Sequence, residues 1–113
     1  MSQTDKIAYK ILTPEQFAAL VEDRFSGAPV DIADGYIHLS TAAQLDETLR
    51  KHFHGQDDLV IAAIDLTSLG GTLNWEVSRG GQLFPHVYGP LRHAHVLAHG
   101  PLIWENGSAK LPG

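Results

Sequence analysis

The stretch from Asp34 to Thr41 constrains the fold most, because a turn, a short strand and the start of a helix are encoded within eight residues. The Asp-Gly at its start predicts a turn in which the glycine takes a positive φ angle. The alternation that follows predicts a strand with one apolar and one polar face. The apolar face carries Ile37 and Leu39, and the polar face carries Tyr36, His38 and Ser40.

Thr41 begins the sequence Thr-Ala-Ala-Gln, which is typical of a capping box at a helix N-terminus. We expect the Thr41 hydroxyl to accept from the amide of Gln44, and the Gln44 side chain to reach back to the amide of Thr41. A strand that runs directly into a helix start collects free amide donors beside the imidazole of His38 and the hydroxyl of Ser40. This stretch is therefore our candidate for a site that binds an anionic or polar ligand.

The remaining signals predict an α+β fold, because strands and helices alternate first and strands follow. Strands are predicted at residues 7–12, 36–40, 59–65, 73–78 and 93–103, with a break in the last one at Gly100-Pro101. Helices are predicted at 14–26 and 41–54, and loops at 28–33, 79–82 and 84–91. The run at 59–65 is continuously apolar, which is typical of a central strand buried on both faces.

The predicted core takes one stripe from each helix and both faces of the apolar strand. It consists of Phe17, Leu20, Leu45, Leu49, Ile61 and Ile64. A chain of 113 residues is large enough to fold around such a core without disulfides, and it contains no cysteine. We therefore expect a single domain over residues 1–113, with a tail that frays after about residue 104.

Composition and charge disfavour several classes of function. The formal net charge is −5, and the eight Lys and Arg residues are scattered, with only Arg50 and Lys51 adjacent, so there is no basic stripe to bind nucleic acid. The first residues lack the pattern of a secretory signal, and no apolar stretch approaches the ~18 residues of a membrane span. We expect a cytoplasmic protein whose partner is a small molecule or a nucleotide, with no role for nucleic acid or membrane.

Four polar residues near strand ends or in a loop rich in Gly and Pro are candidates for chemistry: His38, Ser40, Glu76 and His86. Together they are able to form a hydrogen-bonded base with an electrostatic stabiliser, and we expect them to line one concave pocket. Each also has a structural interpretation, because a strand histidine often only hydrogen-bonds and Glu76 is close enough to pair with Arg79. Serine hydrolysis is disfavoured, since no G-x-S-x-G motif surrounds Ser40.

A second histidine group lies near the C-terminus. His93, His95 and His99 share one face if the last strand is regular, and His-x-His on a strand is able to hold a transition metal. An edge strand with its histidines turned to solvent explains the same pattern, and Gly100-Pro101 interrupts the register. We expect no metal ion at the main site and keep this metal site as the least favoured alternative.

Four segments resemble the small bacterial proteins catalogued as domain of unknown function 952. They are residues 7–11 (IAYKI), 34–41 (DGYIHLST) followed by Gln44, 75–79 (WEVSR) and 84–91 (FPHVYGPL). On these motifs the chain is identified as a member of that family over nearly its whole length. The family is similar to the ADP-ribosyltransferase fold, a split mixed or antiparallel sheet with two helices, whose enzymes bind NAD in a cleft.

This resemblance implies roles for particular residues. ADP-ribosyltransferases place an Arg or His on the first core strand, a hydroxyl residue on the next, and a Glu later. Ser40 and Thr41 match the hydroxyl position, and Glu76 matches the acid that hydrogen-bonds the nicotinamide ribose. The first strand here lacks the Arg or His, so His38 would replace it.

The resemblance thus implies an ADP-ribosyltransferase-like activity on NAD or a related nucleotide. The catalytic candidates are Glu76, His38 and Ser40, and the ligand-binding candidates are Tyr36, Thr41, Arg79, His86 and Tyr88. His86 and Tyr88 are not part of the enzyme pattern and suit a pocket for another ligand equally well. The alternative is a non-catalytic module of the same fold that binds a small ligand.

Overall fold

The structure is a computed structural model and describes residues 5–113, apart from the side chain of Arg79. Its strands are β1 (Ile7–Leu12), β2 (Ile37–His38), β3 (Val60–Asp65), β4 (Leu73–Val77), β5 (Leu83–Val87), β6 (Val96–Pro101), β7 (Trp104–Glu105) and β8 (Ser108–Ala109). Its helices are α1 (Pro14–Val21), α2 (Pro29–Asp34) and α3 (Ala42–His52). The α+β class predicted from the sequence is therefore correct.

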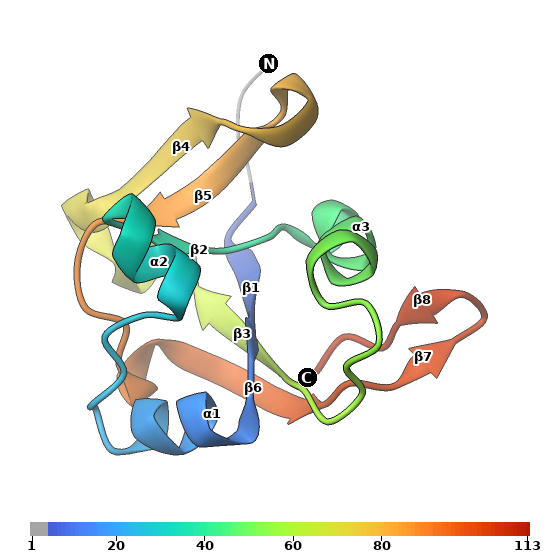
Figure 1. Cartoon of the computed structure of the whole chain (residues 1–113). Coiled ribbons are helices and arrows are strands. Elements are labelled where there is room, and N and C mark those ends of the chain that lie inside the picture. The colour runs from blue at the N-terminus through green and yellow to red at the C-terminus, as the bar shows by residue number, and fades with distance from the viewer. Residues whose placement is uncertain (1–4) are drawn as a thin grey trace.

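Six strands form two three-stranded sheets, ordered β1-β3-β6 and β2-β5-β4, in which every described pair is antiparallel. The residues after β2 join the two sheets (Figure 1). The Leu39 amide donates to the Pro85 carbonyl of β5 at 3.1 Å, and Ser40 exchanges hydrogen bonds of 2.7 and 2.9 Å with Tyr9 of β1. Because proline has no N–H, Pro85 cannot return a bond to Leu39, and the chain crosses to β1 at this point.

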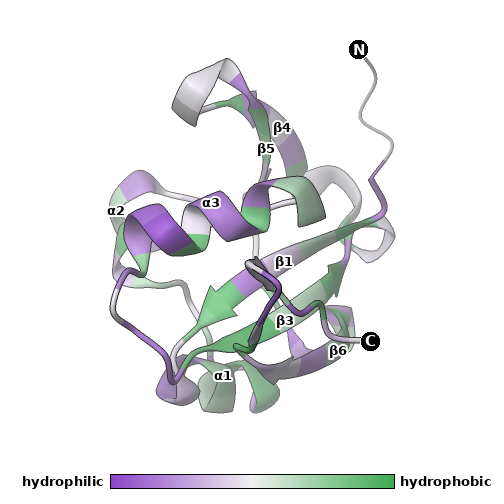
Figure 2. Ribbon diagram, turned by 90° about the vertical axis from the view of Figure 1, so that its right-hand side faces the viewer, coloured by the Kyte–Doolittle hydropathy of each residue, from purple (hydrophilic) through white to green (hydrophobic). Residues whose placement is uncertain are grey.

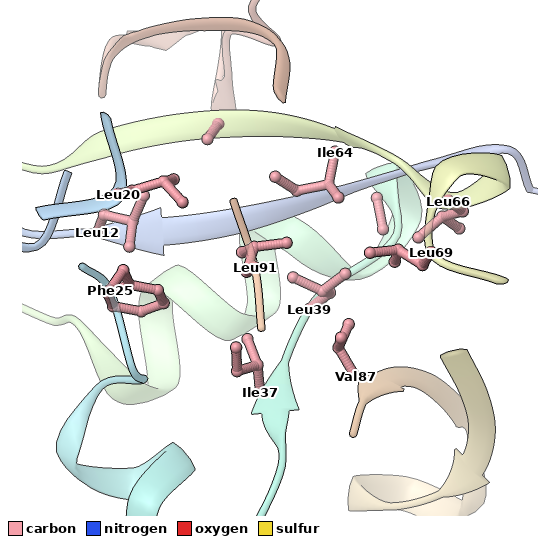
Figure 3. Close-up of a cluster of buried hydrophobic side chains, with 12 residues drawn as sticks. Leu12, Leu20, Phe25, Ile37, Leu39, Ile64, Leu66, Leu69, Val87 and Leu91 are labelled. Atoms are coloured by element: carbon pink, nitrogen blue, oxygen red, sulfur yellow. The ribbon is translucent and has the colours of Figure 1, made fainter. Parts of the chain in front are cut away.

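The core has two layers, one on each face of the first sheet. β3 is the middle strand and is buried on both faces, as its apolar run predicts. Ile64 packs in one cluster with Leu20 of α1 (Figure 3), and Ile61 packs in the other with Leu45 and Leu49 of α3. Figure 2 shows α1 and α3 on opposite sides of the apolar β1 and β3. All six predicted core residues belong to these clusters or, like Phe17, pack against one.

The local predictions for the Asp34–Thr41 stretch are confirmed in part, because β2 spans only Ile37–His38 and the Gln44 amide donates to the carbonyl of Thr41 at 3.0 Å rather than to its hydroxyl. Gly35 has a φ angle of 87°, and Ile37 and Leu39 are 5% and 2% exposed. The Gln44 side chain accepts from the Thr41 amide at 3.0 Å, as expected of a capping box. A strand therefore leads into a capped helix within a few residues.

Residues 29–34 form α2, where we predicted a loop over 28–33. Pro29 occupies the first helical turn, which suits its fixed φ angle, and the Asp31 carboxylate accepts from the Ala28 amide at 2.8 Å. Six residues carry no helical periodicity, so the sequence shows only this start signal. The fold thus has three helices rather than two, and no described helix is long and apolar enough to cross a membrane.

Three C-terminal segments also differ from the prediction. Residues 84–87 are not an irregular loop, because β5 begins at Leu83 and pairs with strands on both sides, whereas residues 88–91 are irregular as predicted. His93–His95 form a 3₁₀ turn, and the last long strand begins only at Val96. The tail does not fray: β7 and β8 form a hairpin that turns at Asn106-Gly107, and Ala109 packs beside α3. Pairing between strands overrides local composition in β5 and in the hairpin of β7 and β8.

Leu49→Ala should lower the free energy of unfolding by on the order of 2 to 5 kcal/mol, because this 2% exposed side chain would leave a cavity in the α3 layer. Urea unfolding measures the change. Ile32→Ala is the control, since Ile32 is 64% exposed, and it should cost under about 1 kcal/mol. Wild-type stability in Leu49→Ala would contradict the packing of this helix face.

Candidate functional site

A cleft of about 630 Å³ opens where the two sheets meet, and its exposed wall is mostly apolar. The walls come from β1, α2, the segment from β2 to Ser40, the end of α3, and β5. Three of the four side chains that we expected to converge, those of His38, Ser40 and His86, line this cleft. Glu76 does not line it.

Glu76 nevertheless lies on the same face of the second sheet as the two histidines. His38 is paired with His86 across β2 and β5, and Glu76 is paired with Phe84 two residues further along β5. Residues two apart on a strand, and residues paired across strands, point to one face. The sheet therefore presents these polar side chains on one face, and Glu76 lies beside the residues that line the cleft.

Asp31 contacts Lys10 and His38, which line the cleft, and is itself 2% exposed. Its Oδ2 accepts from Lys10 Nζ at 2.9 Å and from the Ala28 amide at 2.8 Å, and its Oδ1 accepts from the His38 amide at 3.1 Å. Burial raises the pKa of Asp31, but hydrogen bonds from His38 and the charge of Lys10 outweigh it and hold this pKa at about 2. Burial lowers the pKa of Lys10, and Asp31 offsets part of that change.

The His38 imidazole lies between two carboxylates. Its Nδ1 is 2.7 Å from Asp31 Oδ1, and its Nε2 is 2.9 Å from Asp34 Oδ2. Asp31 is ionised and only accepts hydrogen bonds, so Nδ1 of His38 carries a proton. Asp34 accepts from the ring as well only when Nε2 also carries a proton. His38 therefore uses both nitrogens to tie β2 to α2.

Glu76 and His86 form a second carboxylate–imidazole pair. His86 Nδ1 is 2.7 Å from Glu76 Oε1, and the Tyr88 hydroxyl donates to the same oxygen at 2.7 Å. Hydrogen bonds from Tyr88 and then His86 lower the pKa of Glu76, and the bond to Glu76 raises the pKa of Tyr88 to about 12. Glu76 is 41% exposed while His86 is 3% exposed, so the imidazole is the inner member of this pair.

Tyr36 fills the space beside both histidines. Its ring centroid is 4.7 Å from that of His38 and 4.1 Å from that of His86, and it stacks on Tyr88 at 5.2 Å with an interplanar angle of 10°. Burial, and then the charges of Asp34 and Glu76, raise the pKa of Tyr36. Tyr36 and Tyr88 therefore support the imidazoles from outside the cleft wall.

The Ser40 hydroxyl is engaged with α3. Its Oγ is 3.0 Å from Thr48 Oγ1, and Thr48 donates its own proton to the Gln44 carbonyl at 3.0 Å. Ser40 must then be the donor to Thr48, which leaves only lone pairs of Ser40 for a ligand. No imidazole contacts this hydroxyl among the described residues, which agrees with the argument against serine hydrolysis.

Two other predicted ligand-binding residues have different surroundings. Thr41 is 6% exposed and serves as the cap of α3, and the side chain of Arg79 lies outside the described part of the structure. Sequence reasoning missed Lys10, Asp31 and His52, all of which contact or line the site. Pro29 before Asp31 marked a helix start, but nothing local indicated that Lys10 would be its partner.

The C-terminal histidines do not form the metal site that we kept as an alternative. His93 and His95 lie in a 3₁₀ turn, where His95 Nδ1 accepts from the Arg92 amide at 2.9 Å, and His99 contacts the ring of Phe17 at 4.5 Å. Within residues 5–113, no group of three His, Cys, Asp or Glu side chains is arranged to hold a metal ion.

Residues 11–99 match the model of the family described as protein of unknown function (DUF952), and the chain belongs to that family. It is similar to the crystal structure of protein CC0527 from Caulobacter crescentus, with 42% identity and a TM-score of 0.83 over 92% of this chain and 93% of that one. The solution NMR structure of CC0527 gives 42% identity and a TM-score of 0.78 over 93% and 91%. No curated protein matches the chain.

Acid should weaken the fold through Asp31. Its pKa of about 2 lies below its ordinary value of 3.8, so the ionised form stabilises the fold above about pH 4, and this stability is lost as the pH falls towards 2. The loss amounts to about 2 kcal/mol. Urea unfolding at a series of pH values measures it.

Asp31→Asn should cost about 3–5 kcal/mol at neutral pH, because it leaves Lys10 buried without its counter-charge. Its stability should then fall less than that of wild type between pH 4 and pH 2. Asp57→Asn, at an exposed carboxylate, is the control and should keep the wild-type profile. Parallel profiles for Asp31→Asn and wild type would contradict the role of Asp31.

Proposed function

We propose that the chain binds NAD or a related nucleotide in the cleft between its two sheets. The observation that carries this proposal is a largely apolar cleft of about 630 Å³ with His38, Ser40 and His86 in one wall. Binding pockets for small molecules typically have volumes of roughly 300–1,000 Å³ and combine apolar walls with a few convergent polar groups. Tyr9, Phe53 and Phe84 add aromatic rings on which a planar base could stack.

The resemblance to ADP-ribosyltransferases points to the same cleft. Those enzymes bind NAD in the cleft of a split sheet, and the sheet here is split at Leu39 and Ser40, where the cleft opens. In this proposal His38, Ser40 and Glu76 take the places of the catalytic residues. Glu76 acts from behind His86, because its carboxylate contacts His86 and Tyr88 rather than the cleft.

A second candidate function is binding without catalysis. Both nitrogens of His38 are engaged by carboxylates, and the proton of Ser40 is engaged by Thr48. Side chains committed in this way can shape and orient a ligand without moving a proton. This candidate predicts affinity for NAD without cleavage of its glycosidic bond.

Calorimetry with NAD and ADP-ribose tests the proposal, with Val30→Trp as the blocking variant. Val30 lines the cleft and is 56% exposed, so a larger side chain there should enter the cleft and weaken binding at least tenfold, or by about 1.4 kcal/mol. Ile32→Trp on the same helix is the matched control, because Ile32 does not line this cleft. Absence of binding to wild type, or equal binding by both variants, would contradict the proposal.

Turnover separates the two candidates. If the chain cleaves NAD, Glu76→Gln should lower the rate by on the order of a hundredfold while changing affinity little, because it removes a negative charge that favours the transition state. Glu22→Gln is the control, since this exposed carboxylate pairs only with Arg24 among the described residues. Normal turnover by Glu76→Gln would make Glu76 a structural residue.

A further inference from the structure

One ring nitrogen of His86 is not bonded by any group in the described part of the chain. Its side chain is 3% exposed, and its Nδ1 is engaged by Glu76 at 2.7 Å. Among the described side chains, which do not include that of Arg79, Nε2 has no hydrogen-bond partner, yet no fully buried nitrogen or oxygen of these side chains lacks one. Nε2 must therefore retain the small exposure of this residue. Because His86 lines the cleft, the cleft is where that nitrogen meets solvent or a ligand.

The partners of His86 determine which nitrogen carries the proton. Hydrogen bonds from Tyr88 and His86 lower the pKa of Glu76, so its carboxylate is ionised near neutral pH and only accepts. Nδ1 must then carry the proton that Glu76 accepts. In the neutral ring, this tautomer leaves a lone pair on Nε2.

Tyr88 and Tyr36 hold this arrangement in place. The Tyr88 hydroxyl donates to the same Glu76 oxygen that accepts from His86, at 2.7 Å. The ring of Tyr88 stacks on Tyr36, and Tyr36 contacts the ring of His86 at 4.1 Å. A carboxylate and an imidazole that are each fixed from two sides keep one tautomer and one orientation.

We infer that Glu76 and Tyr88 are positioning residues that hold His86 with its Nε2 as a hydrogen-bond acceptor in the cleft. Nε2 then accepts a hydrogen bond from a hydroxyl of the ligand and does not bind a phosphate. Ser40 strengthens the selection, because its proton is given to Thr48 and only its lone pairs are open. A hydroxyl donates to such acceptors, whereas phosphate oxygens require donors. This inference deepens the proposed function by assigning the sugar of a nucleotide, rather than its phosphates, to this wall.

The experiment is a long-range ¹H–¹⁵N correlation spectrum of the histidine rings in the whole protein, recorded at mildly alkaline pH. The free protein should show His86 with its proton on Nδ1. D-ribose in excess should shift the Nε2 signal of His86, and dimethyl phosphate at the same concentration should not, because a phosphodiester anion has acceptor oxygens and no O–H. A proton on Nε2, a shift with dimethyl phosphate, or no shift with ribose would each overturn the inference.

Variants test the two positioning residues. Glu76→Ala should populate both tautomers of His86, whereas Glu22→Ala should leave the single tautomer unchanged. Tyr88→Phe should keep the tautomer but raise the pKa of the Glu76 carboxyl, which ¹³C titration measures, because the Tyr88 bond is the largest cause that lowers it. An unchanged tautomer in Glu76→Ala would show that Glu76 does not position His86. An unchanged Glu76 pKa in Tyr88→Phe would show the same for Tyr88.

The same data separate this inference from the proposed function. If ribose shifts Nε2 while calorimetry finds no affinity for NAD, the acceptor site stands and the nucleotide function fails. If NAD binds while Nε2 responds only to dimethyl phosphate, the nucleotide function stands and the acceptor site is wrong.

Discussion

The buried carboxylate of Asp31 connects more of this structure than any other single group. Its two oxygens bind Lys10 of β1, the Ala28 amide at the start of α2, and both the backbone and the ring of His38 in β2. A buried charge is tolerated only when its partners satisfy it, so these three segments must come together for Asp31 to be buried at all. The interaction thereby fixes β2 and α2 against the first sheet and forms one end of the cleft.

Signals that depend on neighbouring residues could be predicted from the sequence. The buried positions of Ile37 and Leu39, the bond from the Thr41 amide to the Gln44 side chain and the apolar run of β3 each depend on nearby residues, and the structure has them as predicted. β5 was not predicted from the sequence, because Pro85 and Gly89 favour a turn locally. Its hydrogen bonds come from β4, which is joined to it by the short segment after Val77, and from β2, which lies far away in the sequence, and the N–H that Pro85 lacks falls where the pairing with β2 ends.

The candidate site, too, could be predicted only in part from the sequence. Strand alternation put His38 and Glu76 on the polar faces of their strands, because side chains change sides at every residue, but the place of His86 opposite His38 follows only from the pairing of β2 with β5. It could not reveal that His38 is satisfied by Asp31 and Asp34, or that Glu76 stands behind His86, since these contacts depend on side-chain geometry. Of the two imidazoles on this sheet face, that of His38 is committed to the fold and that of His86 has an open nitrogen among the described residues.

A crystal structure determined after soaking with ADP-ribose tests the central claim most directly. The account predicts ligand density in the cleft, with a sugar hydroxyl within hydrogen-bond distance of His86 Nε2 and the Glu76–His86 contact unchanged. Ligand density outside the cleft, or a phosphate group in contact with His86, would contradict this account.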